Sequence, residues 1–161
     1  MVEYSNKKHL KLLNYLLDCK NQSKSLHIED PEADAELNQY QIYLQDHIFW
    51  SKREGFVLLM KYFLDDSLEL EQFEIDFSLL WWETMNEYDA FALDLKRIDN
   101  FHPNSGSCEF CSWITAIYRQ FEDLEDEYCT KQEVKDFVKK VYLKLFLYFN
   151  YLQLLFIHCF F

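Results

Sequence analysis

The chain has 161 residues, of which 50% are hydrophobic and 19% aromatic, and it carries a formal net charge of −12. This length suits one domain with a sizeable core, and the apolar and aromatic content excludes disorder of the whole chain. Only two Gly and two Pro occur, so few tight turns are available. The composition therefore predicts an all-α protein with long helices and argues against an all-β fold.

The acidic balance narrows the kinds of partner that the chain can bind. Nucleic-acid phosphates and anionic membrane surfaces would both be repelled by this charge. A basic protein is the natural complement, because opposite fields accelerate encounter and fix orientation. The same charge also serves plain solubility, and composition does not separate these two roles.

The cysteine content indicates free thiols rather than a disulfide framework. The five cysteines are an odd number, and the first 21 residues carry charged and polar side chains through their apolar run, unlike a secretion signal. We therefore expect a reducing intracellular compartment, such as a bacterial cytoplasm or a plastid stroma. Abundant Phe, Tyr, Leu, Lys and Asn beside only three Arg are what an AT-rich bacterial or organellar genome would encode.

Residues 1–50 are predicted to form a helical extension in front of the main domain. Apolar residues share one face of a first helix at Leu10, Leu13, Leu16 and Leu17. The polar stretch that follows contains Pro31 and five acids between residues 29 and 36, so we expect a loop that leads into a second helix. The apolar positions that mark this second helix are Leu37, Tyr40, Leu44 and Ile48.

Residues 51–161 are predicted to form the main domain, and its first helix ends in a polar turn. The apolar positions of that helix are Phe56, Leu59, Met60, Phe63 and Leu64. In the turn, Ser67 is placed to cap the next helix. One face of the next helix carries Phe73, Phe77, Leu80, Trp81 and Tyr88. Ile75 and Trp82 lie on another side, and we expect the N-terminal helices to cover them.

Two further helices complete the predicted main domain. The apolar pattern continues through Phe91, Leu95 and Ile98 and breaks at a predicted loop, residues 100–106. The helix after the loop is marked by Phe110, Trp113, Ile114, Ile117, Phe121, Leu124 and Tyr128. The last helix opens with a capping box, in which Thr130 and Glu133 bond each other's backbone amides. Its predicted buried stripe consists of Val134, Phe137, Val138, Val141, Leu145, Tyr148, Phe149 and Leu152.

The C-terminal run, residues 145–161, is very apolar. It is 17 residues long and contains Asn150, Gln153 and His158, whereas a membrane span needs about 20 predominantly apolar residues. A membrane span is therefore the less favoured interpretation, and the apolar end of a core helix is the preferred one.

No constellation of residues predicts catalysis, so we expect a protein that is not an enzyme and holds no metal or cofactor. The only metal-like spacing combines His102, Cys108, Cys111 and Cys129, and one Cys-x-x-Cys pair is a weak zinc signal. A redox pair is disfavoured because no βαβ pattern surrounds it. The sequence has no Glu-x-x-His pair, no Gly-rich phosphate loop and no nucleophile elbow.

Acidic side chains gather in two segments. Between Asp65 and Asp99, eleven acids stand against two bases. Five more acids lie within residues 122–127, at the C-terminal end of a predicted helix, where the helix dipole disfavours negative charge. These acids are either solvated or kept for binding. The predicted partner-binding residues are Glu83, Glu87, Asp89, Glu122, Asp123, Glu125, Asp126 and Glu127.

The segment from Phe56 to Phe77, with its Phe-Leu helix end, acidic turn and Phe-Glu pair, and the following Leu80-Trp81 resemble the colicin-D-type, or self-protective colicin-like, immunity proteins. The final helix from Thr130 resembles the family's closing helix, so the resemblance covers roughly residues 52–146. It implies an antiparallel four-helix bundle, here with additional N-terminal helices. It also implies an acidic surface that takes the place of RNA on a basic toxin nuclease. The extra N-terminal residues and the apolar tail depart from the family.

The leading functional prediction is an acidic helical binding module that masks a basic protein partner, as an immunity protein inhibits its toxin. The alternative is a structural or assembly subunit that associates through its apolar C-terminal helix. For this alternative an organellar genome is one expected source of the gene. Neither prediction involves a cofactor.

Overall fold

The structure is a computed structural model that describes residues 4–93 and 105–158. Over these residues it has seven helices and no strand, which confirms the predicted all-α class. The predicted loop at residues 100–106 falls mostly outside the described residues. In chain order the helices are α1 (Asn6–Asn21), α2 (Leu26–Glu29), α3 (Pro31–Ser51), α4 (Arg53–Leu64), α5 (Leu70–Leu93), α6 (Ser105–Glu125) and α7 (Lys131–His158).

The stretch predicted as a loop before the second helix is shorter than expected. It contains α2 and the beginning of α3. The Asp30 side chain accepts a hydrogen bond from the Ala33 amide at 3.0 Å, and Pro31 occupies the first helical position. An Asp cap followed by Pro is a strong start signal, because Pro has no amide to leave unpaired there.

The sequence predicts a capping residue at the start of α5 and a capping box at the start of α7, and only the second is found. Helix α5 begins at Leu70, so Ser67 lies too early to cap it and that prediction is wrong. The Ser67 amide instead bonds the Tyr62 carbonyl, closing the end of α4. The predicted capping box is confirmed: the Thr130 amide donates to Glu133 Oε2 at 2.8 Å, and the Glu133 amide donates to Thr130 Oγ1 at 3.3 Å.

The buried side chains form two hydrophobic clusters. The smaller cluster joins α1, α2 and the part of α3 from Leu37 to Ile48, and Tyr88 near the end of α5 packs against it. In α1, Leu12 and Leu13 are buried, whereas Leu10 and Leu17 are exposed. The predicted face of the first helix is therefore wrong at its two outer positions, because α1 turns the side with Leu12 and His9 toward α3.

The larger cluster lies among α4, α5, α6, α7 and the end of α3. The fully buried side chains that α4, α5 and α6 contribute to it include Phe56, Phe77, Phe110 and Ile114. Helix α3 ends at Ser51, next to the predicted boundary between the N-terminal extension and the main domain, yet Phe49 of α3 is fully buried in this cluster. Helix α3 packs on both α5 and α6, so it connects the two clusters.

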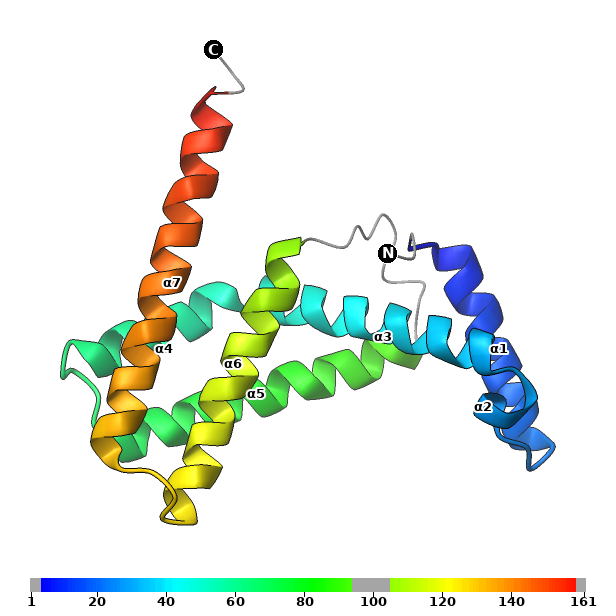
Figure 1. Ribbon diagram of the computed structural model, residues 1–161, viewed down its shortest axis with the longest axis horizontal. Helices are drawn as coiled ribbons and strands as arrows, with labels where there is room; N and C mark the ends of the chain where they lie inside the picture. The colour runs from blue at the N-terminus through cyan, green and yellow to red at the C-terminus, as the bar shows by residue number, and fades with distance from the viewer. Residues whose placement is uncertain (1–3, 94–104, 159–161) are drawn as a thin grey trace.

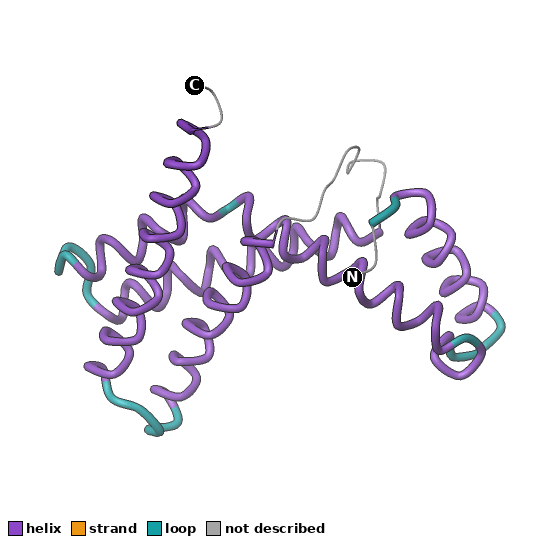
Figure 2. Tube along the Cα trace, turned by 45° about the horizontal axis from the view of Figure 1, so that its top comes forward, coloured by secondary structure: helices purple, strands orange, loops and turns teal. Residues whose placement is uncertain are grey.

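Helix α7 contributes Val134, Val138, Val141 and Leu145 to the larger cluster, as the sequence predicts. Beyond these positions its C-terminal part stands clear of the other helices (Figures 1 and 2). Over the described residues, no helix combines the length and the apolar character that crossing a membrane requires.

Candidate protein-binding face on helix α5

Helix α5 is apolar on two opposite sides, and only one of them is buried. The inward side carries Phe73 and Phe77, both fully buried. The outward side carries Ile75, Leu79 and Trp82, whose exposed fractions are 55%, 58% and 53%. Their i, i+4, i+7 spacing puts the three on one face of the helix. We call these three residues the apolar ridge.

The prediction that the N-terminal helices cover this side of α5 is wrong. Helices α1 and α2 pack on α3 and on each other, at the far end of the molecule (Figure 1). Their buried apolar residues belong to the smaller cluster. The apolar ridge is therefore left in water, which makes it a candidate interaction surface.

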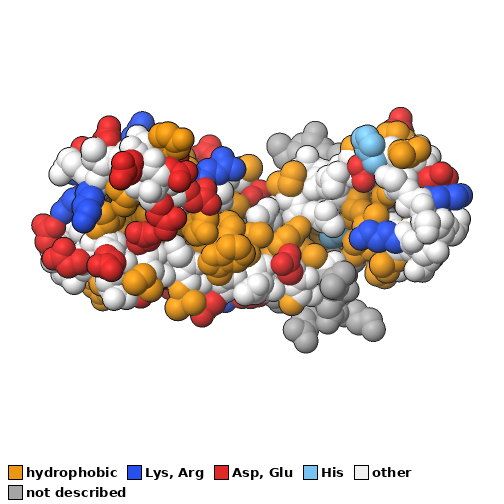
Figure 3. All heavy atoms as spheres, turned by 90° about the horizontal axis from the view of Figure 1, so that it is seen from below, with side chains coloured by type: hydrophobic (Ala, Val, Ile, Leu, Met, Phe, Trp, Pro, Cys, Tyr) orange, Lys and Arg blue, Asp and Glu red, His pale blue; other side chains and the backbone are white. Residues whose placement is uncertain are grey.

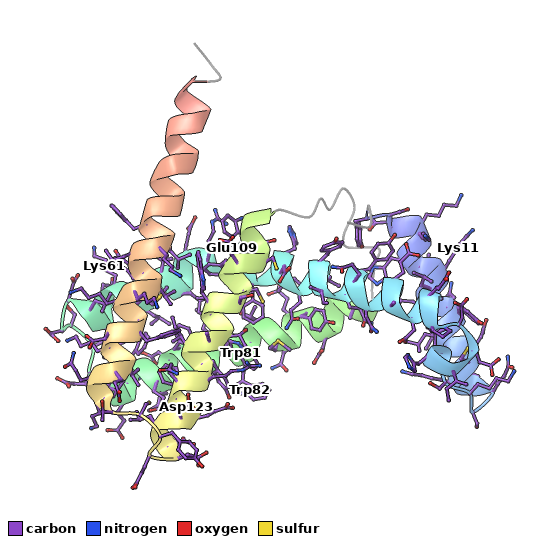
Figure 4. All side chains as sticks on the ribbon, viewed as in Figure 1. Lys11, Lys61, Trp81, Trp82, Glu109 and Asp123 are labelled. Atoms are coloured by element: carbon purple, nitrogen blue, oxygen red, sulfur yellow. The ribbon has the colours of Figure 1, made fainter. Side chains whose placement is uncertain are left out.

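Two aromatic neighbours hold Trp82 in place. The Trp81 ring stacks on Tyr118 of α6, with centroids 4.4 Å apart and planes 16° apart. Trp82 stands edge-on to Trp81 at 5.1 Å and to Tyr118 at 6.4 Å. Figure 4 shows Trp82 on the side of α5 that faces away from α3. A large aromatic side chain that is exposed yet supported by fixed rings loses little freedom on binding.

Acidic side chains border the apolar ridge on the same side of α5. Glu71 precedes Ile75 by one helical turn, Glu83 follows Leu79 by one turn, and Asp89 continues the face beyond Trp82. All three carboxylates are exposed. Among the described residues, none of them forms an ion pair with a Lys or Arg.

The C-terminal end of α6 adds further negative charge beside the start of α5. Phe121 of α6 contacts Phe73 and Phe77, with centroids 5.7 and 5.6 Å away, so this end of α6 lies against the first half of α5. Burial raises the pKa of Glu74, and the charges of Glu125 and Glu71 raise it further. Such an effect requires like charges that are close together and poorly compensated.

The structure separates the eight predicted partner-binding residues into three places. The five acids Glu122, Asp123, Glu125, Asp126 and Glu127 lie at the end of α6 and just beyond it. Glu83 and Asp89 border the ridge. Glu87 is half-buried and its carboxylate lies 2.6 Å from Lys52 Nζ, so its charge is already compensated. Figure 3 shows hydrophobic side chains midway along the molecule next to a group of acidic ones.

The metal-like spacing does not come together in space. Cys108 and Cys111 lie at the start of α6, whereas Cys129 follows its other end and folds back toward Gln120, which is about 14 Å from Cys111 at the rise of an α-helix. The Cys129 thiol donates to the Gln120 carbonyl at 3.6 Å. Within residues 4–93 and 105–158, no group of three or more His, Cys, Asp or Glu side chains could hold a metal ion. His102 lies outside the described residues.

Sequence reasoning missed Leu79 and Tyr118 as members of this surface. Leu79 follows Ile75 by four residues, which is a readable signal, while the stacking of Tyr118 on Trp81 depends on how α6 crosses α5. Comparison of the chain with known protein families, with curated proteins and with solved structures found no match.

Proposed function

We propose that the chain is a binding module that docks a basic protein on the apolar ridge and on the acidic residues around it. The observation that carries this proposal is the exposed, ring-supported Trp82 on the same side of α5 as Glu71, Glu83 and Asp89. A buried aromatic anchor supplies most of the free energy of such interfaces, and complementary charge supplies specificity and a fast encounter.

The more specific form of the proposal is an inhibitor of the immunity type. In that form the helices α4 to α7 act as a four-helix bundle, and the acidic face covers the basic surface on which a toxin nuclease holds its RNA. Inhibition then needs no chemistry from the inhibitor, only steric occlusion and charge. The acids that continue from Glu122 past the end of α6 extend the negative surface beyond the ridge.

The test is a pull-down at low salt with the immobilised chain, compared between wild type and Trp82→Ala. We expect wild type to retain a basic protein that dissociates as salt rises, because screening weakens exposed charge pairs. Trp82→Ala should weaken this binding at least about tenfold, as hot-spot truncations do. The matched control is Leu58→Ala, which truncates an exposed apolar residue of α4.

Two outcomes would contradict the proposal. One is a partner that Trp82→Ala and Leu58→Ala retain equally well. The other is a partner whose retention changes neither when Glu83 and Asp89 are replaced by Gln and Asn nor when the salt concentration is raised. Either outcome would move the binding surface away from α5.

A second candidate function is assembly through the C-terminal part of α7. The observation that favours it is the position of this segment, which projects from the rest of the molecule although its sequence is apolar (Figure 2). A projecting apolar helix gains free energy when it packs against another helix. In this function the acidic face only maintains solubility.

Truncation after Asn150 separates the two functions. If assembly is the function, wild type should be oligomeric by light scattering and the truncated chain monomeric, with no effect of Trp82→Ala. If masking of a basic partner is the function, the truncated chain should keep its partner.

A further inference from the structure

A buried carboxylate lies beneath the Cys-x-x-Cys pair where α3 packs on the start of α6. Asp46 is 6% exposed, and its carboxylate accepts hydrogen bonds from the thiols of both Cys108 and Cys111. The three groups come from two helices that form an extensive contact. The sequence offers no signal for this arrangement, because nothing in the pattern around Asp46 distinguishes it from the other polar residues of α3.

The two thiols differ in access. Cys108, in the first turn of α6, is exposed, whereas Cys111 is 7% exposed and also hydrogen-bonds to Thr115. Side chains three residues apart on a helix are neighbours, with backbones at a separation that a disulfide spans. Cys108 is therefore open to a molecule from solution, whereas Cys111 is shielded from solution and neighbours Cys108 on the same helix face.

We propose that Cys108, Cys111 and Asp46 form a thiol–disulfide exchange site that reacts with low-molecular-weight disulfides of the glutathione class. Cys108 is the attacking thiol, Cys111 is the resolving thiol, and Asp46 takes the proton of Cys111. This site is independent of the partner-binding face on α5.

The exchange has two balanced steps. Cys108 loses its proton to solvent and its sulfur attacks one sulfur of the external disulfide, whose S–S bond breaks and releases one thiolate that is protonated by water. Cys111 then gives its proton to Asp46 while its sulfur attacks the Cys108 sulfur, and the mixed disulfide breaks. The second thiolate leaves and takes that proton. The external disulfide is reduced by two electrons to two thiols, and the protein dithiol is oxidised to one disulfide.

The surroundings of the pair make the reaction slow at neutral pH and readily reversible. Burial raises the pKa of Cys111 to about 12, and the charge of Asp46 acts in the same direction. The pKa of Cys108 is raised by burial and by the charges of Asp46 and Glu109. Oxidation also removes both thiol donors from a buried carboxylate, which is unfavourable, so the disulfide form should be reduced easily.

The experiment incubates the full chain with oxidised glutathione, followed by acid quenching, alkylation and mass mapping. Wild type should form a Cys108–Cys111 disulfide with little lasting glutathione adduct. Cys111→Ser should accumulate one adduct on Cys108, and Cys108→Ser should leave Cys111 unreacted. Asp46→Asn, which keeps the shape of the carboxylate, should slow the resolving step about a hundredfold or more, the lower end of the usual range for loss of a general base. Cys129→Ser is the matched control and should react like wild type at Cys108.

Three results would overturn the proposal. The first is a lasting adduct on wild-type Cys108 as abundant as that on Cys111→Ser. The second is an adduct on Cys129 that forms as fast as the one on Cys108. The third is an unchanged resolving rate in Asp46→Asn with native circular dichroism, which would leave Asp46 with no part in the exchange.

Discussion

Replacing Phe77 by Ala should lower the free energy of unfolding by about 3–5 kcal/mol, the usual cost of deleting a buried aromatic ring. Phe77 is fully buried, and its ring contacts Phe56, Phe73 and Phe121 with centroid distances of 5.1, 5.4 and 5.6 Å. These rings come from α4, α5 and α6. Truncation to Ala would therefore remove ring contacts among three helices at once and leave a cavity between them.

Urea unfolding followed by circular dichroism measures this loss as a lower transition midpoint at an unchanged slope. The matched control is Leu79→Ala, two residues further along α5 on the exposed ridge. It should change the free energy of unfolding by no more than about 0.5 kcal/mol, as exposed substitutions usually do. Equal effects of the two substitutions would mean that α5 is oriented differently about its axis.

Lowering the pH from 7 to 4 should cost on the order of 3 kcal/mol of stability through His9 alone. His9 is fully buried against Tyr4 and Tyr40, and burial lowers its pKa to about 4 from an ordinary value of 6.5. The unfolded chain takes up the proton first. The stability that neutral His9 provides is therefore complete above pH 6.5 and is lost as the pH falls from 6.5 toward 4.

His9→Phe tests this assignment, because it keeps a ring between Tyr4 and Tyr40 and cannot be protonated. The difference in free energy of unfolding between wild type and His9→Phe should change steadily between pH 6.5 and 4 in favour of the variant. His27→Gln removes an exposed histidine and controls for the change in total charge. A constant difference between wild type and His9→Phe across this pH range would show that His9 is not the titrating group.

Helix positions and several helix ends could be predicted from the sequence because their causes are local. The capping box of Thr130 and Glu133 requires only residues three apart, and the valine stripe of α7 requires only helical periodicity. The same local rules failed at Leu10 and Leu17, where two faces of α1 are both apolar. Which face is buried then depends on the helix that packs against it, and the periodicity of α1 carries no information about that neighbouring helix.

The sequence by itself determined that this protein is helical and acidic, and that α5 is apolar on two sides. The tertiary structure decided that α1 and α2 cover α3 and leave Trp82 in water, and that Lys52 compensates Glu87 while Glu83 stays exposed. It also brought Asp46 beneath Cys108. The physical reason is that composition and periodicity act within a helix, whereas exposure and charge compensation depend on contacts between residues far apart in the chain. Both candidate sites depend on such contacts.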